Sequence, residues 1–147
     1  MVSNAAVLAQ ADTQYAAAAA DKIAAGKVEK QIDEITTPIT GKSAAKIDAA
    51  KGAYNALTEA QKALVPTAKV KLLDDEDKAV KFIVKVEAIK AVSSDVNKSD
   101  IEAAKVEYYG KAAEGETPAV PGLADSVKAV LVENPFAVID AAIDVEN

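Results

Sequence analysis

The chain has 147 residues, of which 50% are hydrophobic and 27% are charged, and its formal net charge is −6. It contains no cysteine, histidine or tryptophan, and all 17 basic residues are lysine. This composition excludes disulfides, zinc sites built on cysteine or histidine, and catalysis by a Ser-His-Asp triad. The acidic balance argues against a nucleic-acid partner, which needs a basic surface. No apolar run approaches the roughly 20 residues of a membrane-spanning helix, so we expect no membrane insertion.

Helix-forming residues dominate the chain, which includes 33 alanines, and they predict an all-α fold. A first helix is predicted from about residue 4 to Ile35. It ends at Thr36-Thr37-Pro38, because the residue before proline avoids helical backbone. A second helix is predicted over 43–57, with Ser43 as its N-cap. Its buried face is predicted to carry Ile47, Ala50, Tyr54 and Leu57.

The segment Thr58-Glu59-Ala60-Gln61 is typical of a capping box, in which the threonine and glutamine side chains each accept a hydrogen bond from the other residue's backbone N–H. It predicts a short helix that runs to Leu64 and stops at Val65-Pro66. A long helix is then predicted over 67–92. Its apolar positions are Val70, Leu73, Val80, Val84 and Ile89.

The second half of the chain shows a similar series of signals. Ser99-Asp100-Ile101-Glu102 predicts another capping box and a helix to about Ala113, followed by a loop over 114–118. We expect Ile101, Ala104 and Tyr108 to share the buried face of this helix. A further helix is predicted over 123–133. A last one is predicted to begin at Asn134-Pro135 and to carry Phe136, Ile139 and Ile143 on one side.

Apolar residues recur at a spacing of 54 positions. The spacing relates Val28 to Phe82 and Phe136, Ile35 to Ile89 and Ile143, Ile47 to Ile101, Ala50 to Ala104, and Tyr54 to Tyr108. Such a period indicates an internal structural repeat. We therefore predict two tandem three-helix-bundle repeats of about 54 residues that share long continuous helices in an elongated array. Residues 1–81 form the first repeat with its leading helix, and 82–147 form the second repeat with the start of a third unit.

The stretch from Ala49 to Val65, AAKGAYNALTEAQKALV, resembles a recurrent AAxxAYxALTxxQKxLV motif. This motif is similar to the helical, three-helix-bundle spacer repeats of Gram-positive cell-surface and S-layer proteins. The resemblance covers about residues 28–135, and the second copy departs from it at 110–117. It implies three-helix units joined by continuous helices, an extracellular location at the cell surface or cell wall, and contact with cell-wall polymer. It carries no catalytic residues, and the chain shows no LPxTG sorting signal or S-layer-homology anchoring pattern.

The acidic cluster Asp74, Asp75, Glu76 and Asp77 offers four carboxylates, the ligand type that Ca²⁺ prefers. Consecutive residues on a helix point in different directions, however, so we interpret the cluster as a solvated helix face. Tyr54 and Tyr108 occupy equivalent repeat positions and are predicted to be packing residues. Tyr109 and Tyr15 are candidates for exposed contacts, including stacking on a sugar ring.

No catalytic, cofactor-binding or metal-binding residue is predicted, and we expect a protein that is not an enzyme. The favoured function is a structural spacer or assembly module of a bacterial surface or S-layer protein. Its expected partners are cell-wall polymer and other copies or domains of the same surface protein. The alternative is an adhesin-like binding module that recognises a host protein or a cell-wall glycan through a helical face. Exposed Tyr109, or a patch on the acidic second repeat, would be the signature of that alternative.

Overall fold

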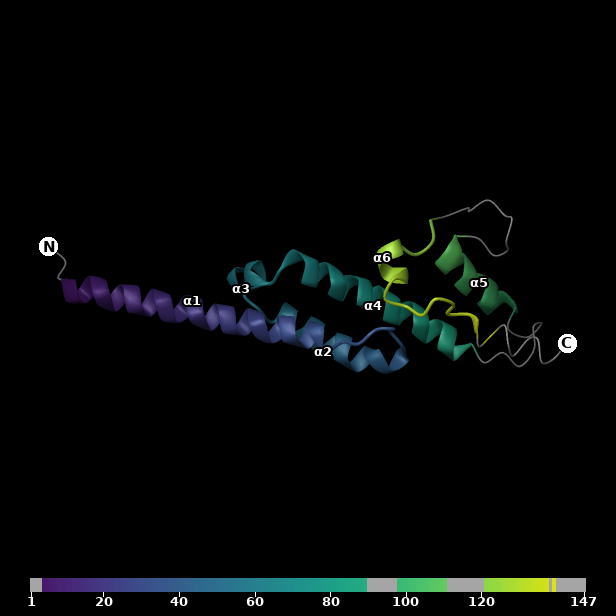
Figure 1. Cartoon of the computed structure of the whole chain (residues 1–147), viewed down its shortest axis with the longest axis horizontal. Coiled ribbons are helices and arrows are strands. Elements are labelled where there is room, and N and C mark those ends of the chain that lie inside the picture. The colour runs from purple at the N-terminus through teal and green to yellow at the C-terminus, as the bar shows by residue number, and fades with distance from the viewer. Residues whose placement is uncertain (1–3, 90–97, 111–120, 138, 140–147) are drawn as a thin grey trace. The chain divides into compact units, whose positions relative to one another are not determined.

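A computed structural model describes residues 4–89, 98–110, 121–137 and 139, with side chains from Gln14 onward. Helices dominate these residues, and no strand occurs among them, so the predicted all-α class is confirmed. The chain divides into two compact units (Figure 1). Unit 1 comprises Met1–Ile35 and Lys46–Leu73, and unit 2 comprises Thr36–Ala45 and Asp74–Asn147.

Unit 1 is built on helix α1 (Asn4–Asp33), which runs without interruption through Gly26. Helix α2 (Ala44–Asn55) and the short helix α3 (Glu59–Leu64) follow, and α3 contacts α1. The Gln61 amide on α3 donates a 2.9 Å hydrogen bond to the Asp21 carboxylate on α1. The Nζ of Lys46 donates to the backbone carbonyl of Glu34. These contacts fix α3 and the start of α2 against α1.

The core of unit 1 consists of apolar side chains from α1, α2 and the residues that follow α3, which itself buries none. On α1 and just beyond it, the buried residues follow three- and four-residue steps, which place them on one helix face. The buried side chains of the unit are Ala25, Val28, Ile32, Ile35, Ile47, Ala50, Val65 and Leu73. Figure 1 shows that the N-terminal half of α1 extends past α3, and Tyr15 in that half is 79% exposed.

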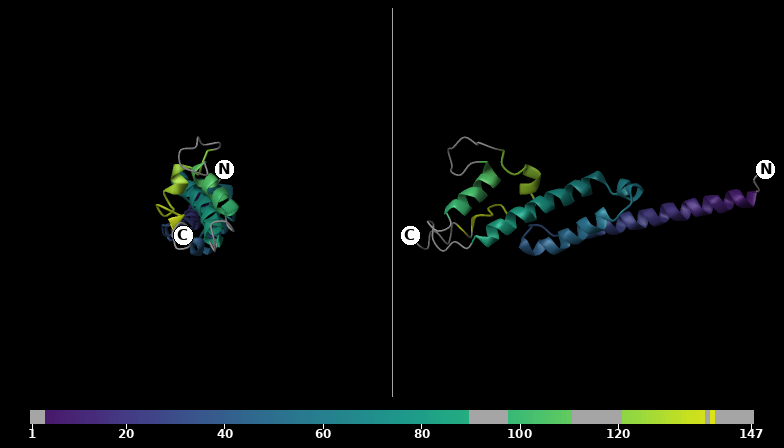
Figure 2. Two further views of the ribbon diagram at one scale, coloured as in Figure 1. Left: turned by 90° about the vertical axis from the view of Figure 1, so that its right-hand side faces the viewer. Right: turned by 180° about the vertical axis from the view of Figure 1, so that it is seen from behind.

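Unit 2 contains the 3₁₀ helix η1 (Gly41–Ser43), the later part of α4 (Thr67–Ala88), α5 (Lys98–Tyr109) and the single-turn α6 (Asp125–Lys128). Figure 2 shows α5 and α6 beside this part of α4. Lys85 on α4 and Glu107 on α5 form an ion pair at 3.1 Å. The apolar core of unit 2 consists of Ile39, Ala79, Val80, Phe82, Ile83, Val86, Ile101, Ala104, Tyr108, Val127, Val130, Leu131, Phe136 and Ile139.

The 54-residue spacing reappears in the structure at two pairs of helices. Helices α2 and α5 are each 12 residues long, and every position of α5 lies 54 residues after its counterpart in α2. The buried pairs Ile47 and Ile101, and Ala50 and Ala104, obey the same spacing. So do the buried stripes of α1 and α4, where Ala25, Val28 and Ile32 correspond to Ala79, Phe82 and Val86. The two sequence copies therefore bury equivalent positions of equivalent helices.

Two expectations for the middle of the chain are wrong in detail. Ser43 does not cap α2. It is the last residue of η1, where its Oγ accepts the backbone N–H of Thr40 in a capping box. The long helix α4 ends at Ala88 rather than at 92. Of its apolar positions, Leu73 and Val80 are buried, whereas Val84 is 45% exposed.

Two expectations for α5 also fail. The helix begins at Lys98, so Ser99 lies inside its first turn and does not cap it. It ends at Tyr109 rather than near Ala113, because Gly110 adopts a left-handed backbone with φ of 80°. The chain after the turn comes back against this end, since Leu123 N–H donates to the carbonyl of Tyr108. The predicted loop over 114–118 lies outside the described residues.

The helix predicted over 123–133 is wrong, since only the four residues of α6 are helical there. A Cβ at Gly122 would collide with the carbonyl of Tyr108, so the turn before α6 depends on this glycine. The predicted cap at Asn134 is present in part, because its Oδ1 accepts the N–H of Phe136 at 3.0 Å. The end of the predicted last helix, with Ile143, lies outside the described residues.

Candidate functional site

The acidic cluster differs from its predicted form. Asp74 is exposed and pairs with Lys78 at 2.7 Å, as a solvated helix face would. The other three carboxyl side chains, Asp75, Glu76 and Asp77, are 6%, 1% and 7% exposed, so the solvated interpretation is wrong for them. Each of the three takes part in polar interactions, including the ion pair of Asp77 with Lys81 at 2.8 Å.

The buried carboxylates do not form a metal site in the described part of the chain. No group of three or more acidic side chains there converges on a point that could hold a metal ion. Instead, the acids form pairs along α4, of which the Asp74–Lys78 pair is fully exposed. The hydrogen bond from Lys78 to Asp74 and the nearby negative charge raise the pKa of the Lys78 ammonium above its usual value. The cluster is therefore a set of helix ion pairs and buried carboxylates rather than a site that brings ligands together.

Four aromatic rings gather in unit 2 around Phe136. The rings of Tyr108 and Tyr109 lie 5.7 Å and 5.8 Å from Phe136, and the ring of Phe82 lies 6.0 Å from it. Phe82 and Phe136 cross edge to face at 77°, a favourable geometry for aromatic pairs. We call these four residues the aromatic cluster. The aromatic cluster joins α4, α5 and the segment after α6. Three of its members, Phe82, Tyr108 and Phe136, occupy positions that recur at the 54-residue spacing.

The aromatic cluster is buried at its centre and open at one edge. Tyr108 is 6% exposed, as predicted for a packing residue. Burial raises the pKa of its phenol above the usual value, and the neighbouring Tyr109 raises it further. Tyr109 is 43% exposed. Two ammonium groups lie over the rings, with Lys128 at 4.9 Å from Tyr108 and Lys105 at 5.9 Å from Phe136. Tyr109 therefore presents an accessible phenol ring at the edge of the cluster, and the two ammonium groups lie over its neighbouring rings.

The two remaining tyrosines lie in unit 1. Tyr54 is half-buried, with the ammonium of Lys62 at 5.7 Å over its ring. Its surroundings are more open than those of its repeat counterpart Tyr108. Tyr15 is almost fully accessible, so a contact role for it is compatible with its position.

The segment Thr36–Ala45, which we call the strap, is anchored in unit 2 although it connects two helices of unit 1. The Ile39 side chain is fully buried, and its N–H donates to the carbonyl of Val130 at 2.7 Å. The N–H of Gly41 donates to both oxygens of the Glu87 carboxylate, each at 3.1 Å. No pattern in the sequence indicated that the strap is anchored to a distant part of the chain.

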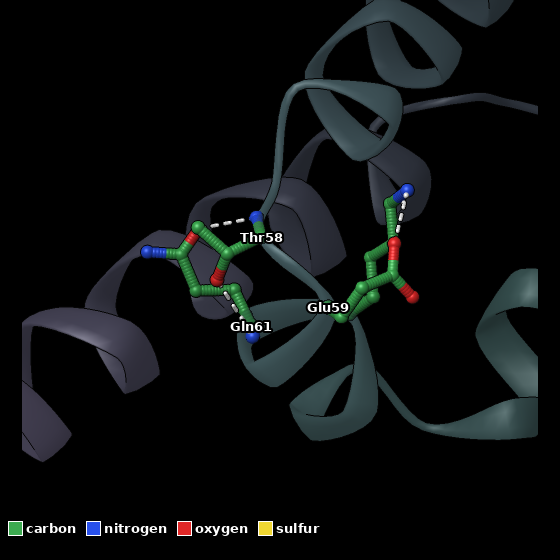
Figure 3. A network of polar contacts seen from close by, with 4 residues as sticks. Thr58, Glu59 and Gln61 are labelled. Carbon is green, nitrogen blue, oxygen red and sulfur yellow. Dashed lines mark hydrogen bonds and ion pairs between the residues drawn. The ribbon is translucent and has the colours of Figure 1, made fainter.

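The capping box predicted at Thr58 is confirmed (Figure 3). Thr58 Oγ1 accepts the N–H of Gln61 at 3.2 Å, and Gln61 Oε1 accepts the N–H of Thr58 at 3.0 Å. The other end of the Gln61 amide binds Asp21 on α1. Thr58 and Gln61 belong to the sequence motif and have a structural role, since they start α3 and attach it to α1.

Two cavities open on unit 2. One, of about 430 Å³, lies between α4 and α5 and is lined by alanines and the Lys85–Glu107 ion pair. The other, of about 300 Å³, is lined mainly by aliphatic side chains of α4, the strap and residues 132–139. Neither is lined by the aromatic cluster or by the acidic cluster.

Comparisons with known proteins give no relative for this chain. No protein-family model matches it, and no curated protein or solved structure is detectably similar. Among the described helices, none is both long and apolar enough to cross a membrane.

Proposed function

We propose that this protein is a non-enzymatic structural spacer made of tandem three-helix-bundle repeats, from a bacterial cell-surface or S-layer protein. The repeat of helix boundaries and buried positions between α2 and α5 is the observation that carries the proposal. In such arrays each unit packs on its neighbours, and repetition sets the length of the molecule. The AAxxAYxALTxxQKxLV motif supports the surface-protein assignment, because its threonine and glutamine form the box that attaches α3 to α1.

The path of the chain adds a mechanical argument. The backbone passes from one unit to the other three times, after Ile35, after Ala45 and after Leu73. A single linker can be stretched while both domains stay folded. Here the strap is anchored by a buried isoleucine and by backbone hydrogen bonds, so a load that separates the units must extract it. Resistance to extension is the property that a spacer needs.

Small-angle scattering and single-molecule stretching test this proposal. We expect a maximum dimension well above that of a compact particle of the same mass, and one cooperative rupture that loses both units together. A near-spherical particle, or two independent ruptures at low force, would contradict it.

Contact with cell-wall polymer is the second part of the proposal and has its own test. The protein is mixed with purified Gram-positive sacculi, with and without their secondary polymer, and pelleted. Polymer-dependent pelleting supports a wall contact made by this segment. Retention in solution under both conditions removes wall contact from the proposal and leaves the spacer.

The open edge of the aromatic cluster favours the alternative, a module that binds a glycan or a host protein. An accessible phenol ring suits stacking on the apolar face of a sugar ring. If this edge makes the contact, Tyr109→Ala reduces pelleting with sacculi, whereas Tyr15→Ala, a matched change at an exposed tyrosine in unit 1, does not. Equal effects of the two variants would count against the aromatic cluster as the binding surface.

A further inference from the structure

The cavity of about 300 Å³ in unit 2 has features of a ligand site that neither the spacer role nor the glycan alternative uses. Its volume is at the lower end of the range for small-molecule sites. Three separate segments form its walls, namely α4, the strap and residues 132–139. We call it the apolar pocket, and its main aliphatic lining is Ile39, Ile83, Val86, Val132, Pro135 and Ile139.

The polar lining of the apolar pocket is electronegative. Among the described residues, Glu87 is the one charged side chain in its lining, and none of the lining residues there is a lysine. A carboxylate has about four acceptor positions, and the Gly41 N–H occupies only part of this capacity. Asn134, which also lines the pocket, directs its Oδ1 to the N–H of Phe136. The Glu87 carboxylate would attract a cation and repel an anion, and an uncharged donor would gain a hydrogen bond without the charge attraction.

We propose that the apolar pocket binds a small aliphatic amine. The alkyl chain would lie against the isoleucine and valine side chains, and the ammonium group would pair with Glu87. This ligand class follows from the combination of an aliphatic lining with a single carboxylate at its rim. The proposal does not depend on the spacer function, and it would hold for a binding module as well.

Binding at this position would also hold the strap. Ile39 and Thr40 belong both to the strap and to the lining, and Glu87 contacts the strap through Gly41. A ligand that binds the folded state and not the unfolded state stabilises the folded state by mass action. The amine would therefore slow the release of the strap as well as fill the pocket.

The test is an NMR titration of the ¹⁵N-labelled full chain with hexylamine, hexanol and hexanoate. These probes share one alkyl chain and differ in charge. We expect saturable shifts at Ile39, Gly41 and Val86 with hexylamine, and slower hydrogen exchange of the Ile39 and Gly41 amides. Hexanol should bind roughly two- to fivefold more weakly than hexylamine, because it lacks the exposed ion pair with Glu87. Hexanoate should bind more weakly still, because its carboxylate is repelled by Glu87. No saturable shift with hexylamine, or equal affinity for hexanoate, would overturn the proposal.

Two variants locate the effect. Val132→Phe narrows the pocket at a side chain that is 36% exposed, so the core is not disturbed. Its matched control is Val84→Phe, an exposed position of α4 outside the lining. We expect hexylamine binding to fall at least severalfold in the first variant and to stay unchanged in the second. Glu87→Gln keeps an acceptor for Gly41 but removes the charge, so the preference for amine over alcohol should disappear. Binding that survives Val132→Phe, or a preference that survives Glu87→Gln, would refute the assignment.

Discussion

Glu87 and Gly41, 46 residues apart in the sequence, are joined by one backbone N–H that donates to both oxygens of one carboxylate. The contact satisfies the first backbone N–H of η1, which has no partner within its own turn. The contact is close, because a Cβ at position 41 would displace the end of the Glu87 side chain from its present position. The strap is therefore held by a specific pairing of a helix end with an acid, in addition to the burial of Ile39.

Gly41→Ala should weaken this attachment. The added methyl group displaces the end of the Glu87 side chain, and the free energy of unfolding is expected to fall by about 0.5–1.5 kcal/mol through the weakened hydrogen bond. Denaturant unfolding monitored by circular dichroism measures the change. The matched control is Gly52→Ala in α2, where a Cβ meets no atom within 4 Å and should stabilise the helix by about 0.5–1 kcal/mol. A loss in the control as large as that in Gly41→Ala would show that the contact between Gly41 and Glu87 is not the cause.

Ile47→Ala and Ile101→Ala test whether the two copies have equivalent cores. Both isoleucines are buried, at 0% and 6% exposure, in helices that share one register. Each change is expected to reduce the free energy of unfolding by about 2–5 kcal/mol, because it removes transfer energy and leaves a cavity. Val84→Ala at an exposed position of α4 serves as the control and should change stability little. A melting temperature that stays constant in either isoleucine variant would refute the shared core.

Thr58→Ala removes one half of the capping box. The N–H of Gln61 then loses its acceptor, and we expect unfolding to become easier by about 0.5–2 kcal/mol. Gln61→Ala should cost at least as much, since the glutamine also binds Asp21. A double-mutant cycle checks the pairing, because strictly additive effects would mean that the two side chains do not act together.

Stability should decline at alkaline pH, and the ionisation of the Tyr108 phenol should account for part of that decline. Burial raises the pKa of this phenol above its ordinary value near 10, so the unfolded state loses the proton first. The contribution of Tyr108 is complete below pH 10 and is lost as pH rises through its folded pKa. Tyr108→Phe should flatten the fall in melting temperature as the pH rises above about 10. An unchanged slope in the variant would assign the alkaline loss to other groups.

Glu76→Ala examines the buried part of the acidic cluster. Glu76 is 1% exposed and takes part in a polar interaction, so the change leaves a cavity and removes that interaction. We expect a loss of about 1–3 kcal/mol in the free energy of unfolding. Asp74→Ala, which removes an exposed carboxylate of the same cluster, should cost less than about 1 kcal/mol. Equal losses would support the solvated-face interpretation that the structure contradicts for Glu76.

The helices that the sequence predicted correctly are those whose signals are local. The box at Thr58 and Gln61 lies within one turn, and the spacing of Ile47 and Ala50 shows which face of α2 is buried. The copy of this pattern at Ile101 and Ala104 gave the position of α5 as well. Local capping chemistry and periodicity are sufficient for such elements.

The features that the sequence did not reveal depend on contacts between distant residues. The helix expected after Leu123 is reduced to one turn where the backbone approaches Tyr108 at Gly122. The burial of Glu76 depends on what packs around α4, and a run of charges gives no sign of it. The anchoring of Ile39 to Val130 likewise joins residues that no short pattern relates. The apolar pocket follows from that anchoring, so it could not be predicted either.

The anchoring of the strap has a consequence for synthesis on the ribosome. Ile39 is translated early, but the carbonyl that accepts its N–H belongs to Val130. At about 5–20 residues per second, the nascent chain waits on the order of ten seconds before that partner exists. During this interval Ile39, the one large aliphatic side chain of the strap, has no core to pack into. We expect the Ile39 amide to exchange freely in stalled nascent chains that stop before Val130, and to be protected in full-length chains.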